Sequence, residues 1–131
     1  MNISDVAKAT GLPVKTIRYY EDIDLITPGR GENGYRRFSV QDQHRLAFIG
    51  RARSLGFSVE ACRSLLLLYN DRDRASADVK RIAREHLAEI ERKRDELTQM
   101  RDTLALLISA CAGNDRPDCP ILADLAAGDG S

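Results

Sequence analysis

The chain lacks tryptophan and has few of the residues that mark irregular or strand-rich proteins, with four prolines and nine glycines among 131 residues. Hydrophobic residues make up 43% and charged residues 31%, which is typical of a globular protein. This composition argues against disorder and predicts a mainly helical chain. The length allows one ordinary domain, or a small domain followed by a long helical extension.

Long apolar runs are also missing. The longest run, Leu65–Tyr69, is far below the roughly 18 residues that a membrane span needs. The first residues, MNISD, contain no basic start followed by an apolar stretch, so we expect no signal peptide. The predicted location is therefore the cytoplasm, with no membrane partner.

Three cysteines, an odd number, argue against the disulfide framework of a secreted protein. In a reducing compartment, two thiols close in sequence, Cys111 and Cys119, indicate metal or redox chemistry instead. Cys62 lies on the apolar face of a predicted helix and is interpreted as a buried structural residue. The sequence has no phosphate-binding glycine loop and no nucleophile–base signature, so we do not expect an enzyme.

The net charge is zero, but the charges are unevenly distributed. Residues 1–70 hold ten Lys and Arg against seven Asp and Glu, whereas residues 71–131 hold ten against thirteen. A net positive N-terminal half has the sign expected of a segment that binds nucleic acid.

The start of the chain predicts a helix-turn-helix followed by a small β-hairpin, or wing. Ser4 is a candidate N-cap of a first helix that ends at Gly11, and Pro13 opens a second helix. Residues 25–27 and 35–38 are the expected strands of the hairpin. The Asn-Gly pair between them is a strong turn signal, because both residues tolerate positive φ.

Basic and aromatic side chains on these elements suit contacts with double-stranded DNA. One face of the second helix carries Lys15, Arg18 and Tyr19, as major-groove insertion requires. In the hairpin, a tyrosine and two arginines suit the anchoring of phosphates. The alternative is a solvated basic helix with a structural tyrosine pair. The predicted DNA-binding residues are Lys15, Thr16, Arg18, Tyr19, Tyr35, Arg36 and Arg37.

A long helix is predicted from Ser76 onward, with a heptad of apolar residues. Eight of the ten seam positions are apolar or cysteine, as in a coiled coil. About 33 residues span roughly 50 Å, too long for the helix to bury its stripe on the small N-terminal domain alone. The simplest partner is the same helix of a second chain, which predicts a homodimer. The seam positions are Val79, Ala83, His86, Ile90, Lys93, Leu97, Met100, Leu104, Leu107 and Cys111.

The loop between Cys111 and Cys119 contains Gly113 and Pro117, and a bent loop of this length can bring both sulfurs to one centre. Two thiolates form a poor zinc set, which usually has four ligands. Two soft sulfurs suit a linear monovalent ion such as Cu(I). Two alternatives remain open at this point: Cys111 is only a packed thiol of the seam, or the pair closes a reversible disulfide as a redox switch.

Taken together, the motifs resemble the MerR family of transcriptional regulators over almost the whole chain. The Cys111-x7-Cys119-Pro120 pattern is most similar to the copper-responsive branch, the copper-efflux regulators. The matching segments are residues 3–7, 16–21, 25–26, 33–36, Arg53, 56–58 and 76–80.

This resemblance implies a mainly α fold, with a winged helix-turn-helix DNA-binding domain at 1–70. A linker and a long antiparallel coiled-coil dimerisation helix follow at 71–110, and a metal-binding loop and C-terminal tail at 111–131. Such regulators bind promoter DNA as dimers and distort it, on binding the effector, so that RNA polymerase can use the promoter.

The resemblance also suggests which ion is sensed. Branches that bind divalent ions carry a cysteine at the start of the long helix, where this chain has Ser76. The missing thiolate favours Cu(I), one ion per loop, while Ag(I) and Au(I) share its chemistry. The alternative on the same scaffold is a thiol–disulfide redox-sensing regulator.

Overall fold

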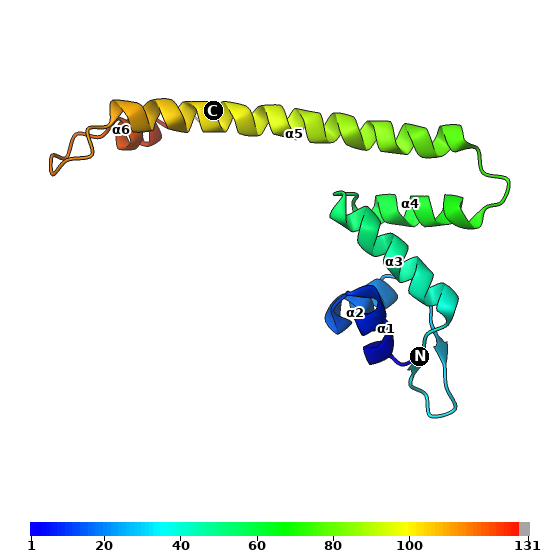
Figure 1. Ribbon diagram of the computed structural model, residues 1–131. Coiled ribbons are helices and arrows are strands. Elements are labelled where there is room, and N and C mark those ends of the chain that lie inside the picture. The colour runs from blue at the N-terminus through cyan, green and yellow to red at the C-terminus, as the bar shows by residue number, and fades with distance from the viewer. Residues whose placement is uncertain (129–131) are drawn as a thin grey trace. The chain divides into compact units, whose positions relative to one another are not determined.

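The computed structural model describes residues 1–128 (Figure 1). The last three residues of the predicted C-terminal tail lie outside the described residues. Two compact units are present, Met1–Ile82 and a second unit from Ala83 onward. The elements in chain order are α1 (Ile3–Thr10), α2 (Val14–Asp22), β1 (Gly29–Arg30), β2 (Arg36–Arg37), α3 (Val40–Ser54), α4 (Val59–Asn70), α5 (Ser76–Ala110) and α6 (Pro120–Ala126).

The predicted helix-turn-helix is confirmed, with a different cap at its start. Asn2, not Ser4, is the N-cap of α1: its Oδ1 accepts from the Asp5 N–H at 2.8 Å, and the Asp5 carboxylate accepts from the Asn2 N–H at 3.2 Å. This reciprocal capping box satisfies two N–H groups at once, which Ser4 alone cannot do. Gly11 ends α1 with a φ of 74°, a conformation that favours glycine.

The wing is a two-stranded antiparallel hairpin in which Gly29 pairs with Arg37 and Arg30 with Arg36. Its second strand lies where expected, but placing the first strand at residues 25–27 was wrong. Leu25 and Ile26 are buried in the core, and their N–H groups donate to the Tyr20 carbonyl at the end of α2. Because that helix end takes their backbone groups, strand pairing starts only at Gly29.

One apolar core holds the first unit together. Helices α2 and α3 both pack with α1, and α4 packs with α3 (Figure 1). Fully burying one side chain of this kind contributes about 1.5–3 kcal/mol. Ser39 and Ser58 cap α3 and α4, as serine N-caps commonly do. Cys62 is fully buried, as expected from its helix face. The core consists of Val6, Ile17, Tyr20, Leu25, Ile26, Phe38, Leu46, Ile49 and Leu66.

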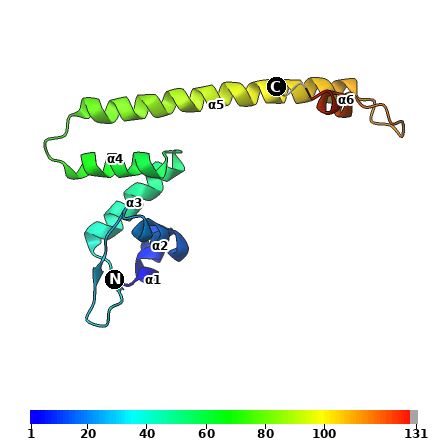
Figure 2. The same ribbon diagram turned by 180° about the vertical axis from the view of Figure 1, so that it is seen from behind.

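The long helix α5 begins at Ser76, as predicted, and contains 35 residues. None of them is buried within a single chain, and the seam residues Ile90, Leu97, Met100 and Leu104 are 44–63% exposed. In the second unit, α6 lies beside the last turns of α5 in both views (Figures 1 and 2). Among the described residues, no helix is both long and apolar enough to cross a membrane.

Candidate metal centre and nucleic-acid interface

The two cysteines of the C-terminal loop lie together. The Sγ atoms of Cys111 and Cys119 are 3.8 Å apart, and both side chains are half-buried. Cys111 directly follows α5, and its N–H donates to the carbonyls of Leu107 and Ile108. Cys119 directly precedes α6. A helix end therefore fixes each sulfur, although the loop that joins them is irregular.

Within that loop, local backbone geometry reverses the chain. Gly113 has a φ of 64°, in the left-handed region that favours glycine. The Oδ1 of Asn114 accepts from the Arg116 N–H at 2.9 Å and forms a short side-chain turn. These two features bring Cys119 back beside the end of α5.

The surroundings of Cys119 favour its thiolate. Backbone N–H groups at the start of α6, that of Leu122 first, together with the Cys111 thiol, hold the pKa of Cys119 below its ordinary value. The thiolate is the form that binds metal ions and attacks disulfides. These surroundings therefore favour the form of Cys119 that both metal binding and disulfide formation require.

The distance between the sulfurs is compatible with a shared ion. At 3.8 Å the sulfurs are too far apart for a disulfide, which requires about 2.05 Å. Thiolates on opposite sides of an ion, each at about 2.3 Å, lie about 4.6 Å apart, so linear coordination requires the two sulfurs to separate by about 0.8 Å. Among residues 1–128, no group of three or more His, Cys, Asp and Glu side chains is placed to hold an ion. Within the described chain, the two sulfurs are therefore the candidate donors at this loop, and their binding of an ion stays a prediction.

Ser76, the predicted selectivity residue, is exposed and is the first residue of α5. It belongs to the first compact unit, whereas both cysteines belong to the second. Its role at the ion stays a prediction.

Helix α2 has two distinct faces. Ile17 is fully buried and Tyr20 is 5% exposed, so this face packs on the core. Lys15 and Arg18 are exposed, and Tyr19 is 51% exposed. Thr16 is half-buried beside them. The predicted contact residues of α2 thus lie at or near one accessible face, although their contact with DNA stays a prediction.

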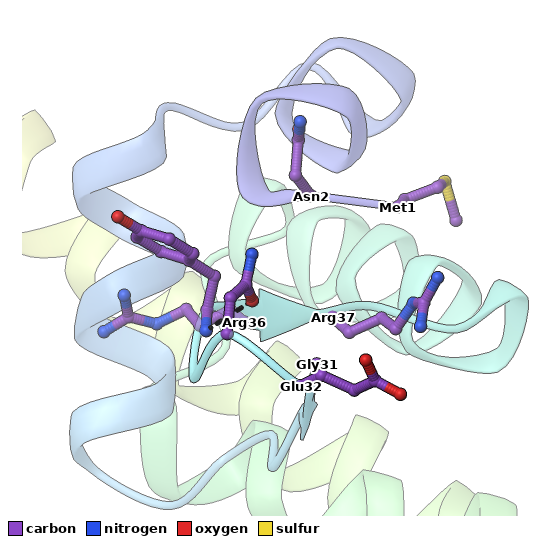
Figure 3. Close-up of a pocket in the computed structure, with 8 residues that line it drawn as sticks. Met1, Asn2, Gly31, Glu32, Arg36 and Arg37 are labelled. Carbon is purple, nitrogen blue, oxygen red and sulfur yellow. Dashed lines mark hydrogen bonds between the residues drawn. The ribbon is translucent and has the colours of Figure 1, made fainter.

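The wing presents its basic residues in two directions. Arg36 and Arg37 leave β2 on opposite sides (Figure 3), as successive residues of a strand do. Arg37 and Tyr35 are exposed, whereas Arg36 is half-buried. A polar cavity of about 570 Å³ lies between the wing and the start of the chain. It is lined by Met1, Asn2, Gly31, Glu32, Asn33, Tyr35, Arg36 and Arg37.

Sequence reasoning missed Glu21, which joins α2 to both strands of the wing. One carboxylate oxygen binds the Arg30 Nη2 at 2.7 Å, and the other binds the Arg36 Nε. The Glu21 side chain is only 15% exposed. A lone glutamate at the end of a helix gives no signal by itself. The signal available was its place between a basic helix and a hairpin rich in arginine.

Two family models match the chain: a model described as MerR HTH family regulatory protein over residues 1–68, and one described as MerR, DNA binding, over residues 43–107. The regulator HmrR of Rhizobium leguminosarum bv. viciae is 61% identical, over 98% of this chain and 99% of its own length. The regulator CueR of Escherichia coli O157:H7 is 50% identical, over 96% and 94%. The lead(II) complex of the transcription regulator PbrR691 from Ralstonia metallidurans CH34 is similar in structure, with a TM-score of 0.84 and 28% identity over 95% and 98%.

Proposed function

Because this chain belongs to the MerR family of transcriptional regulators, we propose that it is a Cu(I)-responsive activator of copper-efflux and tolerance genes. It acts as a homodimer on promoter DNA in the cytoplasm, not as an enzyme, and makes the promoter usable by RNA polymerase. Ag(I) and Au(I) are alternative effectors. In this proposal, residues 1–70 bind DNA, residues 71–110 link and dimerise, and residues 111–131 form the metal-binding loop and tail.

The observation that carries the proposal is the 3.8 Å approach of the Cys111 and Cys119 sulfurs at a half-buried site. Two soft sulfurs satisfy a two-coordinate d¹⁰ ion and leave a divalent ion short of ligands. A metal complex of a similar regulator, that of PbrR691 with lead(II), supports metal binding on this scaffold. The preference for a monovalent ion rests on this chain's own two thiols and on Ser76.

The ion acts by linkage. Cys111 and Cys119 both bind the ion, and these two bonds tie the irregular loop and α6 to the end of α5. Binding shifts the protein toward the conformation with the higher ion affinity, so the ion need only favour the DNA-distorting state over the resting state. Distorting a promoter-sized DNA segment costs a few kcal/mol, which is within reach of such coupling.

The α5 seam supports the dimer. A row of half-exposed apolar side chains along a helix of 35 residues is left without cover in one chain. Pairing with a second α5 buries this row in the way that coiled coils do. On such a dimer, two copies of α2 enter successive major grooves, with Lys15, Arg18 and Tyr19 toward the bases and the wing residues toward the phosphates.

A metal titration of the reduced full-length protein, with the free Cu(I) concentration set by a competing chelator, tests the effector. We expect one Cu(I) per chain, comparable binding of Ag(I), and much weaker binding of zinc. Cys111→Ser and Cys119→Ser should each abolish Cu(I) binding, whereas Cys62→Ser, the matched control, should leave it unchanged. Zinc affinity equal to that for Cu(I) would contradict the monovalent assignment.

The same sulfur distance favours a thiol–disulfide sensor as the second candidate. Closing the Cys111–Cys119 disulfide would transfer two electrons and two protons to an oxidant. Transcription in vitro separates the two functions, with diamide tested in the presence of a metal chelator and Cu(I) tested without it. Activation by diamide to the level reached with Cu(I) would favour the redox sensor, and activation by Cu(I) alone favours the proposal.

A further inference from the structure

The DNA-reading helix α2 ends in an unusual backbone conformation. Asp24 has a φ of 58°, in the left-handed region that residues with a side chain seldom adopt. The backbone N–H groups at this end are used internally: that of Ile23 donates to the Tyr19 carbonyl, and that of Asp24 to the Glu21 carbonyl. The carbonyls of Ile23 and Asp24 accept hydrogen bonds from outside the helix.

Both carbonyls accept from a single side chain, Arg63 of α4. Its Nη2 donates to the Ile23 oxygen at 2.8 Å, and its Nη1 donates to the Asp24 oxygen at 3.1 Å. The Nε side of the same guanidinium faces the Glu60 carboxylate, at 3.5 Å. A planar guanidinium held at three points has a fixed orientation, which a lysine ammonium would not have.

This link joins parts of the chain that are about 40 residues apart in sequence. Leu66, one turn further along α4, belongs to the same core cluster as Tyr20 and Ile26. The end of α2 is therefore fixed to α4 by an apolar contact and by two charge-assisted hydrogen bonds. Apolar contacts permit sliding, whereas hydrogen bonds to a planar group restrict direction.

Helix α4 is also the element that leads to the sensing part of the chain. It ends at Asn70, and α5 begins at Ser76 after five intervening residues. A change in the position of α5 reaches α4 through this short connection. We propose that Arg63 is a positioning residue that passes the displacement of α4 to the end of the DNA-reading helix α2. The proposal rests on the proposed function, because it needs an effector that changes the conformation.

Arg53 provides a matched control outside the connection between α4 and α5. Its Nη1 also donates to a backbone carbonyl, that of Phe57, at 2.7 Å. This bond closes the turn between α3 and α4 locally and does not reach α2. Arg53→Ala thus removes a similar hydrogen bond from a guanidinium without cutting the link between α2 and α4.

The test uses full-length Arg63→Ala, Arg63→Lys and Arg53→Ala with Ag(I) as the effector. The DNA is a duplex selected from a random pool with the wild-type protein and labelled centrally with 2-aminopurine, whose fluorescence reports unstacking. We expect Arg63→Ala to keep the wild-type Ag(I) affinity and to bind the duplex, while its Ag(I)-dependent fluorescence change falls at least about fivefold, the lower range of allosteric coupling. Arg63→Lys should recover part of the change, and Arg53→Ala should retain all of it.

A wild-type fluorescence change in Arg63→Ala would overturn the proposal, as would an equal loss in Arg53→Ala. If Arg63→Ala does not fold, Arg63→Lys decides: a full wild-type response in a folded lysine variant contradicts the directional role of the guanidinium. A wild-type protein that binds no Ag(I) would instead contradict the proposed function, and the coupling role would fall with it. If the wild-type protein responds to Ag(I) but the expected loss in Arg63→Ala is not found, only the coupling role of Arg63 is contradicted and the proposed function stands.

Discussion

Replacing Glu21 by glutamine should loosen the wing from α2, the proposed DNA-reading helix. The carboxylate makes one ion pair with each strand, at 2.7 Å to Arg30 and with the Nε of Arg36. The arginine side chains are 48% and 28% exposed, so solvent screens both pairs. Exposed pairs contribute about 0.2–1 kcal/mol each, which gives roughly 1 kcal/mol for the two together. In a domain of this size, a loss of 1 kcal/mol lowers Tm by about 4–8 °C.

DNA binding adds a second readout to the melting curve. Glu21→Gln retains both arginines, so the slope of log affinity against log salt concentration should not decrease, while affinity for a selected duplex falls because the wing is less well oriented. Arg36→Ala removes a proposed phosphate-binding cation and should reduce the slope by about 0.9. Glu32→Gln is the matched control, an exposed glutamate of the same wing. An unchanged Tm for Glu21→Gln, or an equal decrease for Glu32→Gln, would refute the reasoning.

Other substitutions test the remaining parts of the molecule. Leu97→Glu places a charge on the α5 seam and should convert the proposed dimer to a monomer in sedimentation experiments. Ala88→Glu, on the same helix but off the seam, should leave the dimer intact. A monomeric wild type would contradict the seam assignment. Ser76→Cys adds a third thiolate and should raise zinc affinity by about tenfold or more, equivalent to about 1.4 kcal/mol. An unchanged zinc affinity would indicate that Ser76 lies away from the ion. Arg18→Ala should cost about 1–3 kcal/mol on the selected duplex and less on random DNA, and an equal loss on both would make Arg18 a phosphate contact.

Elements that depend on local signals were predictable from the sequence. Gly11 ends α1 with positive φ, and Ser39 and Ser58 cap α3 and α4. Each signal acts within about four residues, so neighbouring sequence is sufficient to read it. The cap at Asn2 was missed because the box with Asp5 starts two residues before the expected serine.

The features that were not predictable depend on contacts between distant segments. Leu25 and Ile26 have the composition of a strand, but the end of α2 takes their N–H groups and the core takes their side chains. Glu21 and Arg63 look like ordinary charged residues of helices, and their distant partners, in the wing and at the end of α2, are brought to them only by the fold. The spacing and the chemistry of the two cysteines can be read from the sequence, whereas the 3.8 Å separation of their sulfurs depends on the fold.

The features proposed to select the ion lie at the two ends of α5. Ser76 is the first residue of this 35-residue helix, and Cys111 directly follows the last. Such a helix is roughly 50 Å long, so a single chain does not bring both to one ion. In the proposed antiparallel dimer, the start of one α5 lies beside the end of the other, and ion selectivity then becomes a property of the dimer. By linkage, if dimerisation raises the ion affinity by some factor, ion binding raises the association constant of the dimer by the same factor. The monomer produced by Leu97→Glu should therefore lose affinity for Cu(I), although both of its thiols are intact.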